Sequence, residues 1–581
     1  MQFLYRKISL EGHNSFKTLL KKNYKIVQTL QTKTQDPSYE TPHQFQSRSR
    51  TFSKQMKTLS KKLKYSKEVQ LHQALECYRR HEMRSIIKRF QNIRSISFNL
   101  FIPHGSKLAQ DSTTWFRVLK RLSKLWIALE KKAADNIRRD ISPDMLDYFL
   151  RKLPRGNIST FKFSFQTPPR EGFSELLSSK GYSKKLKNLI LIHQPAEDSQ
   201  HVPLSPEILS SSSRMQNLRS LQLSALFSTD NIISLLSMIE KPENFISIQL
   251  KPFLMETSPT PTPESNLPEA LAKFQNLTSL NLDLLYWKGN VANIFEQLSP
   301  MVKLTELKMN LTATKFTDLS KLADAMENLT SLKKLSLRVR SPRITGEEIT
   351  ETCTDIFQTF AGLEKLQRLK IFFRTENMTS RETFNPDHLL SVLSESLLNL
   401  TSLESFSFDF YNYIRSYQWT DFFRKARPIL INLSTLKIHF KGEKLIDDDY
   451  NSFLNLLQNS SHLSQLSLNG FHFILLEHFE KMASCLLKMK RLTRVTFNEV
   501  FGKLERGPLA RFLNEILAKP GFKEFKSDIA NNNQYIMKQA FHHRERVNLK
   551  NITNKNFSLE KAYTPLDIFL GNNDVAYWKW L

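Results

Sequence analysis

The chain repeats one short pattern of apolar residues along most of its 581 positions. In the stretch NLTSLKKLSLRV, residues 328–339, the apolar side chains are separated first by three positions and then by two. This frame, apolar-x-x-apolar-x-apolar, begins at Ile93, Leu122, Ile158, Leu186, Leu218, Phe245, Leu277, Leu304, Leu332, Leu366, Leu403, Leu433, Leu463, Leu492 and, more weakly, Phe522. The mean interval is about 31 residues, and a period between roughly 20 and 50 residues indicates an array of repeated modules.

Each module is expected to contain one strand and one helix. The x-apolar-x-apolar half of the frame predicts a short strand whose alternate side chains point inward. Between frames, residues 345–360 place Ile349, Cys353, Ile356, Phe357 and Phe360 on one helical face, and residues 447–457 follow the same spacing. The sequence therefore predicts an α/β solenoid of parallel strands, in which each module buries its apolar face against its neighbours.

The frame and its period resemble those of leucine-rich-repeat proteins over roughly residues 90–530. A helix in each repeat resembles the long, ribonuclease-inhibitor-like class, which also occurs in F-box-associated repeats. The resemblance implies a horseshoe with parallel strands on the concave face, helices on the convex face, and protein binding as the usual role. One departure is the repeat position where asparagine is expected, which carries Gln194, Leu226, Leu285 and Phe471.

Four regions follow from the repeat boundaries. Residues 1–65 are basic and carry few acids, so we expect a largely disordered or loosely ordered segment. Residues 66–92 predict an N-terminal capping helix, and residues 93–530 predict a solenoid of about 15 repeats. Residues 531–581 end in DVAYWKWL and are expected to form a C-terminal cap.

Charge is the most unusual property of the composition. Lysines and arginines number 84 against 56 acids, which gives a net charge of +28. Residues 1–150 hold 30 basic and 12 acidic residues, a net charge of +18 that leaves +10 for the rest of the chain. Such an excess predicts acidic partners, whether protein, nucleic acid or anionic lipid.

The cysteines and the apolar segments indicate the cellular setting. Cys77, Cys353 and Cys485 lie far apart, which favours a reducing compartment over a disulfide framework or a zinc site. No apolar run reaches the length of about 20 residues that a membrane span needs, and the start of the chain lacks the apolar core of a secretory signal. We expect a cytoplasmic monomer. A nuclear location also fits the charge, and a mitochondrial one fits less well.

Candidate partner-binding residues are those that the frame places on the concave face, at its third, fifth and seventh positions. Basic residues concentrate there in the middle of the array. The candidates are Lys308, Lys334, Arg338, Arg368, Lys370, Phe372, Lys437 and His439. Arginine suits bidentate contacts with carboxylates or phosphates, and Phe372 offers an apolar anchor. The alternative is that a strongly basic chain scatters lysines over every solvated face.

A second basic stretch lies at residues 51–68, TFSKQMKTLSKKLKYSKE. Its apolar residues recur at helical spacing, with Lys54, Lys57, Lys61, Lys62 and Lys64 between them. A basic amphipathic helix of this kind is compatible with an anionic membrane, a calmodulin-like groove, nuclear import or a nucleic-acid backbone. A solvated basic tail is the alternative.

Motifs that carry catalytic chemistry are not found in the sequence. There is no glycine-rich phosphate loop, nucleophile elbow or paired cysteine motif, and glycine numbers only 14. His542 and His543 lack a third ligand nearby, and the acids at 447–449 are expected to cap the helix that follows them. We therefore expect neither a catalytic site nor a metal or cofactor.

The leading hypothesis is a non-catalytic intracellular scaffold that binds a protein partner on its concave face. An acidic protein is one such partner. The first alternative is a substrate-recognition subunit of a ubiquitin ligase, although residues 1–90 show no clear F-box pattern. Another is a protein that associates with nucleic acid or anionic membrane through the basic N-terminal region. A GTPase-activating scaffold resembling the Ran activator would need a dedicated catalytic arginine, and the sequence singles none out.

Overall fold

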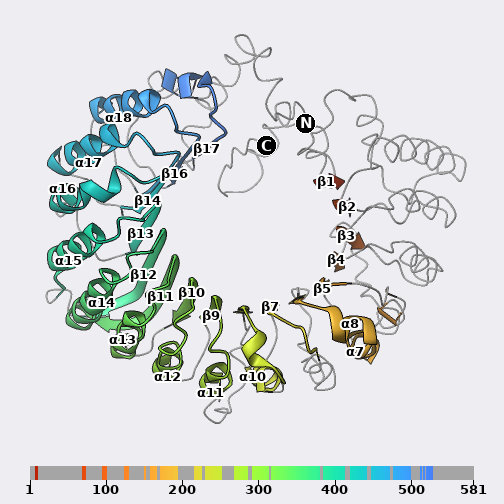
Figure 1. The fold of residues 1–581 in the computed structure, drawn as a ribbon. Coiled ribbons are helices and arrows are strands. Elements are labelled where there is room, and N and C mark those ends of the chain that lie inside the picture. The colour runs from red at the N-terminus through yellow and green to blue at the C-terminus, as the bar shows by residue number, and fades with distance from the viewer. Residues whose placement is uncertain are drawn as a thin grey trace, which may run out of the picture. The chain divides into compact units, whose positions relative to one another are not determined.

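The computed structural model divides the chain into two compact units, Met1–Phe274 and Gln275–Leu581, which we call unit 1 and unit 2. Within each unit the described strands form a parallel sheet, and in unit 2 helices follow most of the strands (Figure 1). The residues described are 7–10, 68–72, 95–100, 124–129, 150–151, 153, 158–165, 171–193, 215–224, 229–237, 239–251, 267–285, 291–312, 316–379, 384–411, 419–440, 447–470, 476–498, 511–512, 514–516 and 518–527.

Unit 1 contains eight described strands that pair in chain order, each parallel to the next. They are β1 (Lys7–Leu10), β2 (Glu68–His72), β3 (Ser95–Leu100), β4 (Lys124–Leu129), β5 (Thr160–Phe165), β6 (Asn188–His193), β7 (Ser220–Ser224) and β8 (Ser247–Lys251). The described helical segments are α7 (Glu171–Ser178), α8 (Lys180–Lys185), α10 (Thr229–Ser237), the 3-10 turn η5 (Pro242–Asn244) and α11 (Leu267–Ala272).

Unit 2 also pairs its strands in chain order, and its later helices, between residues 346 and 488, are longer than those described in unit 1. Its strands are β9 (Ser279–Leu284), β10 (Glu306–Thr312), β11 (Lys334–Thr345), β12 (Arg368–Thr379), β13 (Ser405–Tyr411), β14 (Thr435–His439), β15 (Gln465–Asn469), β16 (Arg494–Asn498) and β17 (Glu524–Ser527). Its helical segments are α12 (Val291–Glu296), the 3-10 turn η6 (Phe316–Leu319), α13 (Ser320–Glu327), α14 (Gly346–Phe360), α15 (Pro386–Leu398), α16 (Trp419–Leu430), α17 (Asp447–Asn459) and α18 (Leu476–Lys488). The helices cover one face of the sheet, and we call the opposite face the open face (Figure 1).

The repeat frame coincides with the strands throughout. Each of the fifteen frames leads into one strand, from β3 after Ile93 to β17 after Phe522. Leu335 and Leu337 of β11 are 1% and 0% exposed, and they lie between Leu307 and Leu369, and between Met309 and Ile371, of the adjoining strands. The prediction of stacked α/β modules is confirmed at this level.

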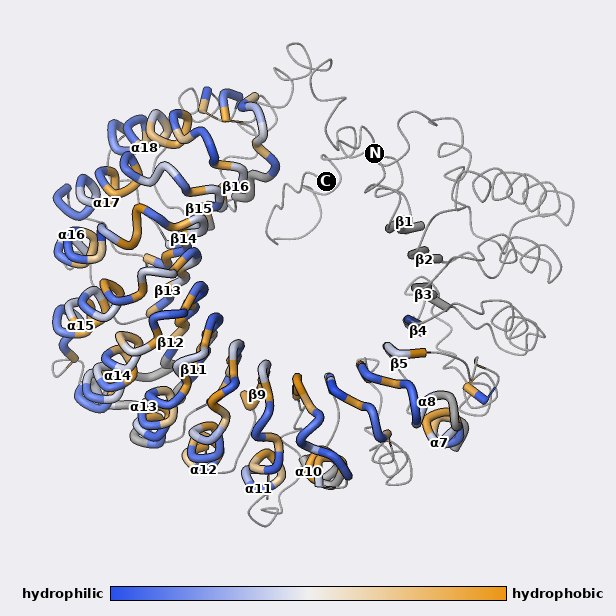
Figure 2. Tube along the Cα trace, in the orientation of Figure 1, coloured by the Kyte–Doolittle hydropathy of each residue, from blue (hydrophilic) through white to orange (hydrophobic). Residues whose placement is uncertain are grey.

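The helices bury the faces that their periodicity predicts. In α14, the side chains of Ile349, Cys353, Ile356, Phe357 and Phe360 are all buried, as expected. The Thr345 hydroxyl accepts a hydrogen bond from Glu348 N, and Glu348 Oε2 accepts one from Thr345 N, which together form a capping box. Figure 2 shows the resulting bands of hydrophilic and hydrophobic residues along the helices.

Backbone hydrogen bonds tie each repeat to the preceding one at the start of its strand. The carbonyl oxygen of Thr305 accepts from both Lys333 N and Lys334 N, at 2.8 and 3.0 Å. The same pair of bonds recurs at the carbonyls of Thr278, Lys333, Gln367, Glu404, Ser434 and Ser464. Because these bonds use only backbone atoms, they hold the repeats together whatever side chains occupy the turn.

Two strands fall in regions for which the sequence predicts something else. Strand β2 at Glu68–His72 lies inside residues 66–92, where we predict a capping helix, and its backbone pairs with β3. Strand β1 lies inside residues 1–65, which we expect to be largely disordered. The remaining parts of these segments, and the predicted cap at 531–581, lie outside the described residues.

The acidic residues at 447–449 lie in the first turn of α17, but one of them, Asp449, binds the start of the preceding helix, α16. Asp447 and Asp448 lie in the first turn of α17, as expected. Asp449 is buried, and its Oδ1 accepts hydrogen bonds from Thr420 N at 2.6 Å and Thr420 Oγ1 at 2.5 Å, at the start of α16. Burial raises the pKa of Asp449, while the bonds from Thr420 act in the opposite direction.

Gly470 follows β15 with a φ of +66°, and a Cβ atom there would lie 1.8 Å from the carbonyl oxygen of Phe440. Gly521 has a φ of +84°, but a Cβ atom there would meet nothing within 4 Å. We expect Gly521→Ala to cost about 1–2 kcal/mol of unfolding free energy from backbone strain, and Gly470→Ala to cost clearly more because a backbone atom must also move. Urea denaturation of both variants measures the difference, and equal losses would contradict the close approach at Gly470.

The raised pKa of Asp449 predicts that its contribution to the unfolding free energy depends on pH. Since its pKa is raised on folding, the folded chain holds a proton that the unfolded chain releases above about pH 3.9. The contribution of Asp449 to the unfolding free energy therefore falls as pH rises through the raised pKa. The variant Asp449→Asn keeps an accepting oxygen for Thr420 and should lose this dependence.

Denaturation of the wild type and of Asp449→Asn at several pH values measures this component. The unfolding free energy of the wild type minus that of the variant should decrease as pH rises. The matched control is Asp421→Asn, since Asp421 is an exposed residue that pairs with Arg424 on the same helix. A difference for Asp449 that stays flat, or that increases with pH, would contradict the burial of an ionisable carboxyl group.

Candidate binding surface

Three lysines form a row across the open face of unit 2. Lys308 of β10, Lys370 of β12 and Lys437 of β14 share one register position, with Ser336 of β11 and Ser407 of β13 between them. All three lysines are exposed. Neighbouring strands lie about 4.8 Å apart, so consecutive lysines of this row are separated by about 9.6 Å at the backbone. We call these three residues the lysine row.

Arg338 and Phe372 are paired in register two residues further along the same strands. The guanidinium carbon of Arg338 lies 4.4 Å from the centre of the Phe372 ring, a cation-π contact between β11 and β12. Burial lowers the pKa of Arg338, and the neighbouring Arg340 lowers it further. Because arginine keeps its charge at any physiological pH, the pair presents a fixed cation beside an aromatic surface.

The acidic side chains that β9, β10 and β13 present on this face, Asp283, Glu306 and Asp409, each contact a neighbouring side chain. Glu306 Oε2 lies 3.0 Å from Lys334 Nζ, and Asp409 Oδ1 lies 2.8 Å from His439 Nδ1. Asp283 Oδ1 accepts a hydrogen bond of 2.9 Å from Asn310 Nδ2.

The lysine row, in contrast, has no ion pair or hydrogen bond within the residues that the structure describes. Partial burial lowers the pKa of Lys370, and Lys437, Arg338 and Lys308 lower it further, while Asp409 acts in the opposite direction. The protein therefore holds several like charges together without enough counter-charge of its own.

All eight predicted partner-binding residues lie at outward positions of β10–β14. They differ in whether their side chains already contact another charged group. Lys334 is partly neutralised by Glu306, and His439 contacts Asp409, whereas Arg368 and the lysine row are exposed. The predicted basic segment with Lys54, Lys57, Lys61, Lys62 and Lys64 lies outside the described residues.

Two arginines that the frame does not reach belong to the same surface. Strands β11 and β12 continue to Thr345 and Thr379, well beyond the seventh frame position. Arg340 and Arg374 therefore stand opposite each other in register, next to Arg338 and Phe372. Val339 and Phe373 continue the alternation of buried apolar residues along these strands. That alternation is the sequence signal that predicts outward positions for Arg340 and Arg374.

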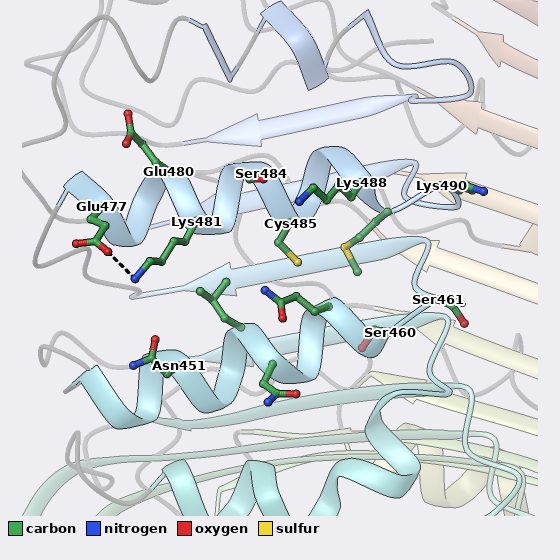
Figure 3. A pocket seen from close by; sticks show the side chains of 14 residues that line it. Asn451, Ser460, Ser461, Glu477, Glu480, Lys481, Ser484, Cys485, Lys488 and Lys490 are labelled. Carbon is green, nitrogen blue, oxygen red and sulfur yellow. Dashed lines mark ion pairs between the residues drawn. The ribbon is translucent and has the colours of Figure 1, made fainter.

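A groove also runs between α17 and α18, on the helical side (Figure 3). The buried side chains of Leu454, Cys485 and Met489 line it, and Glu477 pairs with Lys481 at 2.6 Å near one end. Burial raises the pKa of Cys485 to about 11, so its thiol is protonated near neutral pH and is a poor nucleophile. This groove is the seam between two packed helices, α17 and α18.

Among the described residues, the open face is the main candidate for a functional surface. No helix among the described residues is long and apolar enough to cross a membrane. The same residues contain no group of three or more histidine, cysteine or acidic side chains arranged to hold a metal ion. No protein-family model and no curated protein matches the chain.

The electrostatic coupling within the lysine row is directly measurable. Because Lys437 lowers the pKa of Lys370, the variant Lys437→Met should raise that pKa toward the ordinary value for lysine. Titration of ¹³C-dimethylated lysines by NMR, with the Lys370 signal assigned from a Lys370→Met variant, measures the shift. Lys481→Met, on the helical side, serves as the control. A Lys370 pKa unchanged by Lys437→Met would show that the two ammonium groups do not interact.

Proposed function

We propose that the chain is a leucine-rich-repeat protein of the long-repeat class and that it acts as a non-catalytic interaction scaffold. The regular apolar frame, the parallel strands and the helix that follows most strands of unit 2 support this assignment. On this proposal the open face corresponds to the concave face of the family and binds an acidic protein partner. Parallel strands suit this role, since they present side chains from many repeats on one continuous surface.

The observation that carries the proposal is the imbalance of charge on the open face. Up to Arg340 and Arg374, the outward positions of β10–β14 carry only two acids, Glu306 and Asp409. The basic residues at these positions are Lys308, Lys334, Arg338, Arg340, Arg368, Lys370, Arg374 and Lys437. Charges of one sign on a single surface steer an oppositely charged partner and fix its orientation.

An intracellular role in the cytoplasm is part of the proposal. Cys353 and Cys485 are buried free thiols, as expected for a chain that works in a reducing compartment. A ubiquitin-ligase subunit remains an alternative that no feature of the described residues favours. Association with nucleic acid or an anionic membrane through the N-terminal lysines is a further alternative, and it predicts binding that does not depend on the open face.

The proposal predicts that charge reversal on the open face abolishes binding of an acidic polypeptide. The test variant is Arg338→Glu, Arg368→Glu and Lys370→Glu together, and the control is Lys365→Glu, Lys488→Glu and Lys490→Glu. The control changes net charge equally at exposed sites away from the open face. We expect the affinity for fluorescently labelled polyglutamate to fall at least tenfold in the test variant and less than twofold in the control.

Fluorescence anisotropy over a range of salt concentrations measures both variants, and circular dichroism verifies their folding. An equal loss in the two variants would mean that only net charge matters, which contradicts a defined surface. If the test variant still binds polyglutamate, the proposal that the open face is the binding surface is wrong. A parallel titration with duplex DNA identifies the alternative, if DNA binds more tightly than polyglutamate and binds the test variant equally well.

A further inference from the structure

The spacing of the lysine row restricts what kind of acidic segment fits the open face. Lys308, Lys370 and Lys437 lie on alternate strands, so three positive charges repeat at about 9.6 Å over a total of about 19 Å. The row runs across the strands, in the direction in which the repeats succeed each other. A partner that pairs with all three lysines must therefore repeat its own negative charge at nearly the same interval.

An α-helix has this repeat and an extended strand does not. A helix rises about 1.5 Å per residue, so residues seven apart lie on one face at about 10.5 Å. Two such steps span about 21 Å, which differs from the lysine row by about 2 Å, well within the reach of flexible lysine side chains. In an extended strand, side chains on one face recur at about 6.7 Å and 13.4 Å, and neither matches the interval of the row.

The residues between the lysines allow a helix to approach the sheet closely. Ser336 and Ser407 occupy the same row on the intervening strands, and both are small and partly exposed. Helix residues three or four apart lie about 5 Å apart along the axis, close to the strand spacing of about 4.8 Å. Each serine would thus face the intermediate residue of the helix, where it has room and a hydroxyl to offer.

The flanks of the row are suited to the width of a helix. Arg368 lies on one side of Lys370, and Phe372 with its Arg338 contact lies on the other, each two residues along β12. The distance from Arg368 to Phe372 along the strand is about 13 Å, comparable to the helix diameter of about 10–12 Å. The helix would rest on the lysine row, with an apolar residue against Phe372 and a further acid near Arg368.

We propose that the open face of unit 2 binds an acidic α-helix that lies across β10–β14 and presents carboxylates seven residues apart to Lys308, Lys370 and Lys437. This inference rests on the proposed function, because it specifies the shape of the acidic partner. The crowding of like charges around Lys370 adds to it. Carboxylates placed between these cations would relieve a repulsion that the free protein has to accommodate.

The test compares two synthetic peptides of identical composition in a helix-favouring alanine and glutamine host. One carries glutamates at positions i, i+7 and i+14, and the other carries the same glutamates at i, i+5 and i+10, which spreads them around the helix. We expect the heptad peptide to bind at least tenfold more tightly by fluorescence anisotropy. Its helical content, measured by circular dichroism, should rise on binding.

Two single variants sharpen the comparison. Lys370→Met removes the central charge of the row and should weaken the heptad peptide by at least fivefold while changing the other peptide less than twofold. Lys365→Met removes an exposed charge outside the row and should leave both affinities unchanged. Both substitutions are at exposed positions, so folding is expected to be retained, and thermal denaturation checks this.

The outcomes separate this inference from the proposed function. Equal affinity for the two peptides, with polyglutamate binding still lost on charge reversal, would overturn the helix and keep an acidic partner. Failure of both peptides and of polyglutamate to bind would overturn both proposals. Duplex DNA that outcompetes the heptad peptide at the open face would replace the acidic helix with a nucleic acid.

Discussion

Parallel, in-register pairing of successive strands is the constraint on which the rest of the structure depends. Because each strand of unit 2 is aligned with its neighbour residue by residue, equivalent positions of successive repeats fall in rows across the sheet. Rows that point toward the helices contain leucine, isoleucine, valine, methionine and phenylalanine, and they form a continuous apolar layer. Rows on the open face carry no such requirement, so their composition is free to serve binding.

The same alignment brings side chains that are far apart in the sequence close together on one surface. Lys308 and Lys437 are more than one hundred residues apart, yet they belong to one row with Lys370. Arg338 and Phe372 meet in the next row, and their contact places an aromatic surface beside the cations. On β10 and β13 the acids contact a neighbouring side chain, as Glu306 does with Lys334, and they leave the lysine row without an ion pair among the described residues.

Much of the fold could be predicted from the sequence, because the spacing of apolar residues determines both the strands and the buried faces of the helices. Strand β2 was not predicted because Ser66, a polar residue, occupies the first position of its frame. The other two positions of that frame, Val69 and Leu71, are apolar as the pattern requires. Arg340 and Arg374 were missed because a fixed frame says nothing about strands that run on to twelve residues. The link from Asp449 to Thr420 joins two repeats, and no local sequence pattern reports a cap of that kind.

The alignment of repeats into rows is tested most directly by a distance across the sheet. Asn281 of β9 and Ser467 of β15 share the register position of the lysine row and are separated by six strand spacings. Spin labels attached to Asn281→Cys and Ser467→Cys, in a Cys77→Ser background, allow the distance to be measured by pulsed electron paramagnetic resonance. Six spacings give about 29 Å along the sheet, and less where it curves, so the account predicts one narrow distribution between roughly 20 and 30 Å. A distribution centred beyond about 40 Å, or one without a defined maximum, would contradict the stacked parallel strands.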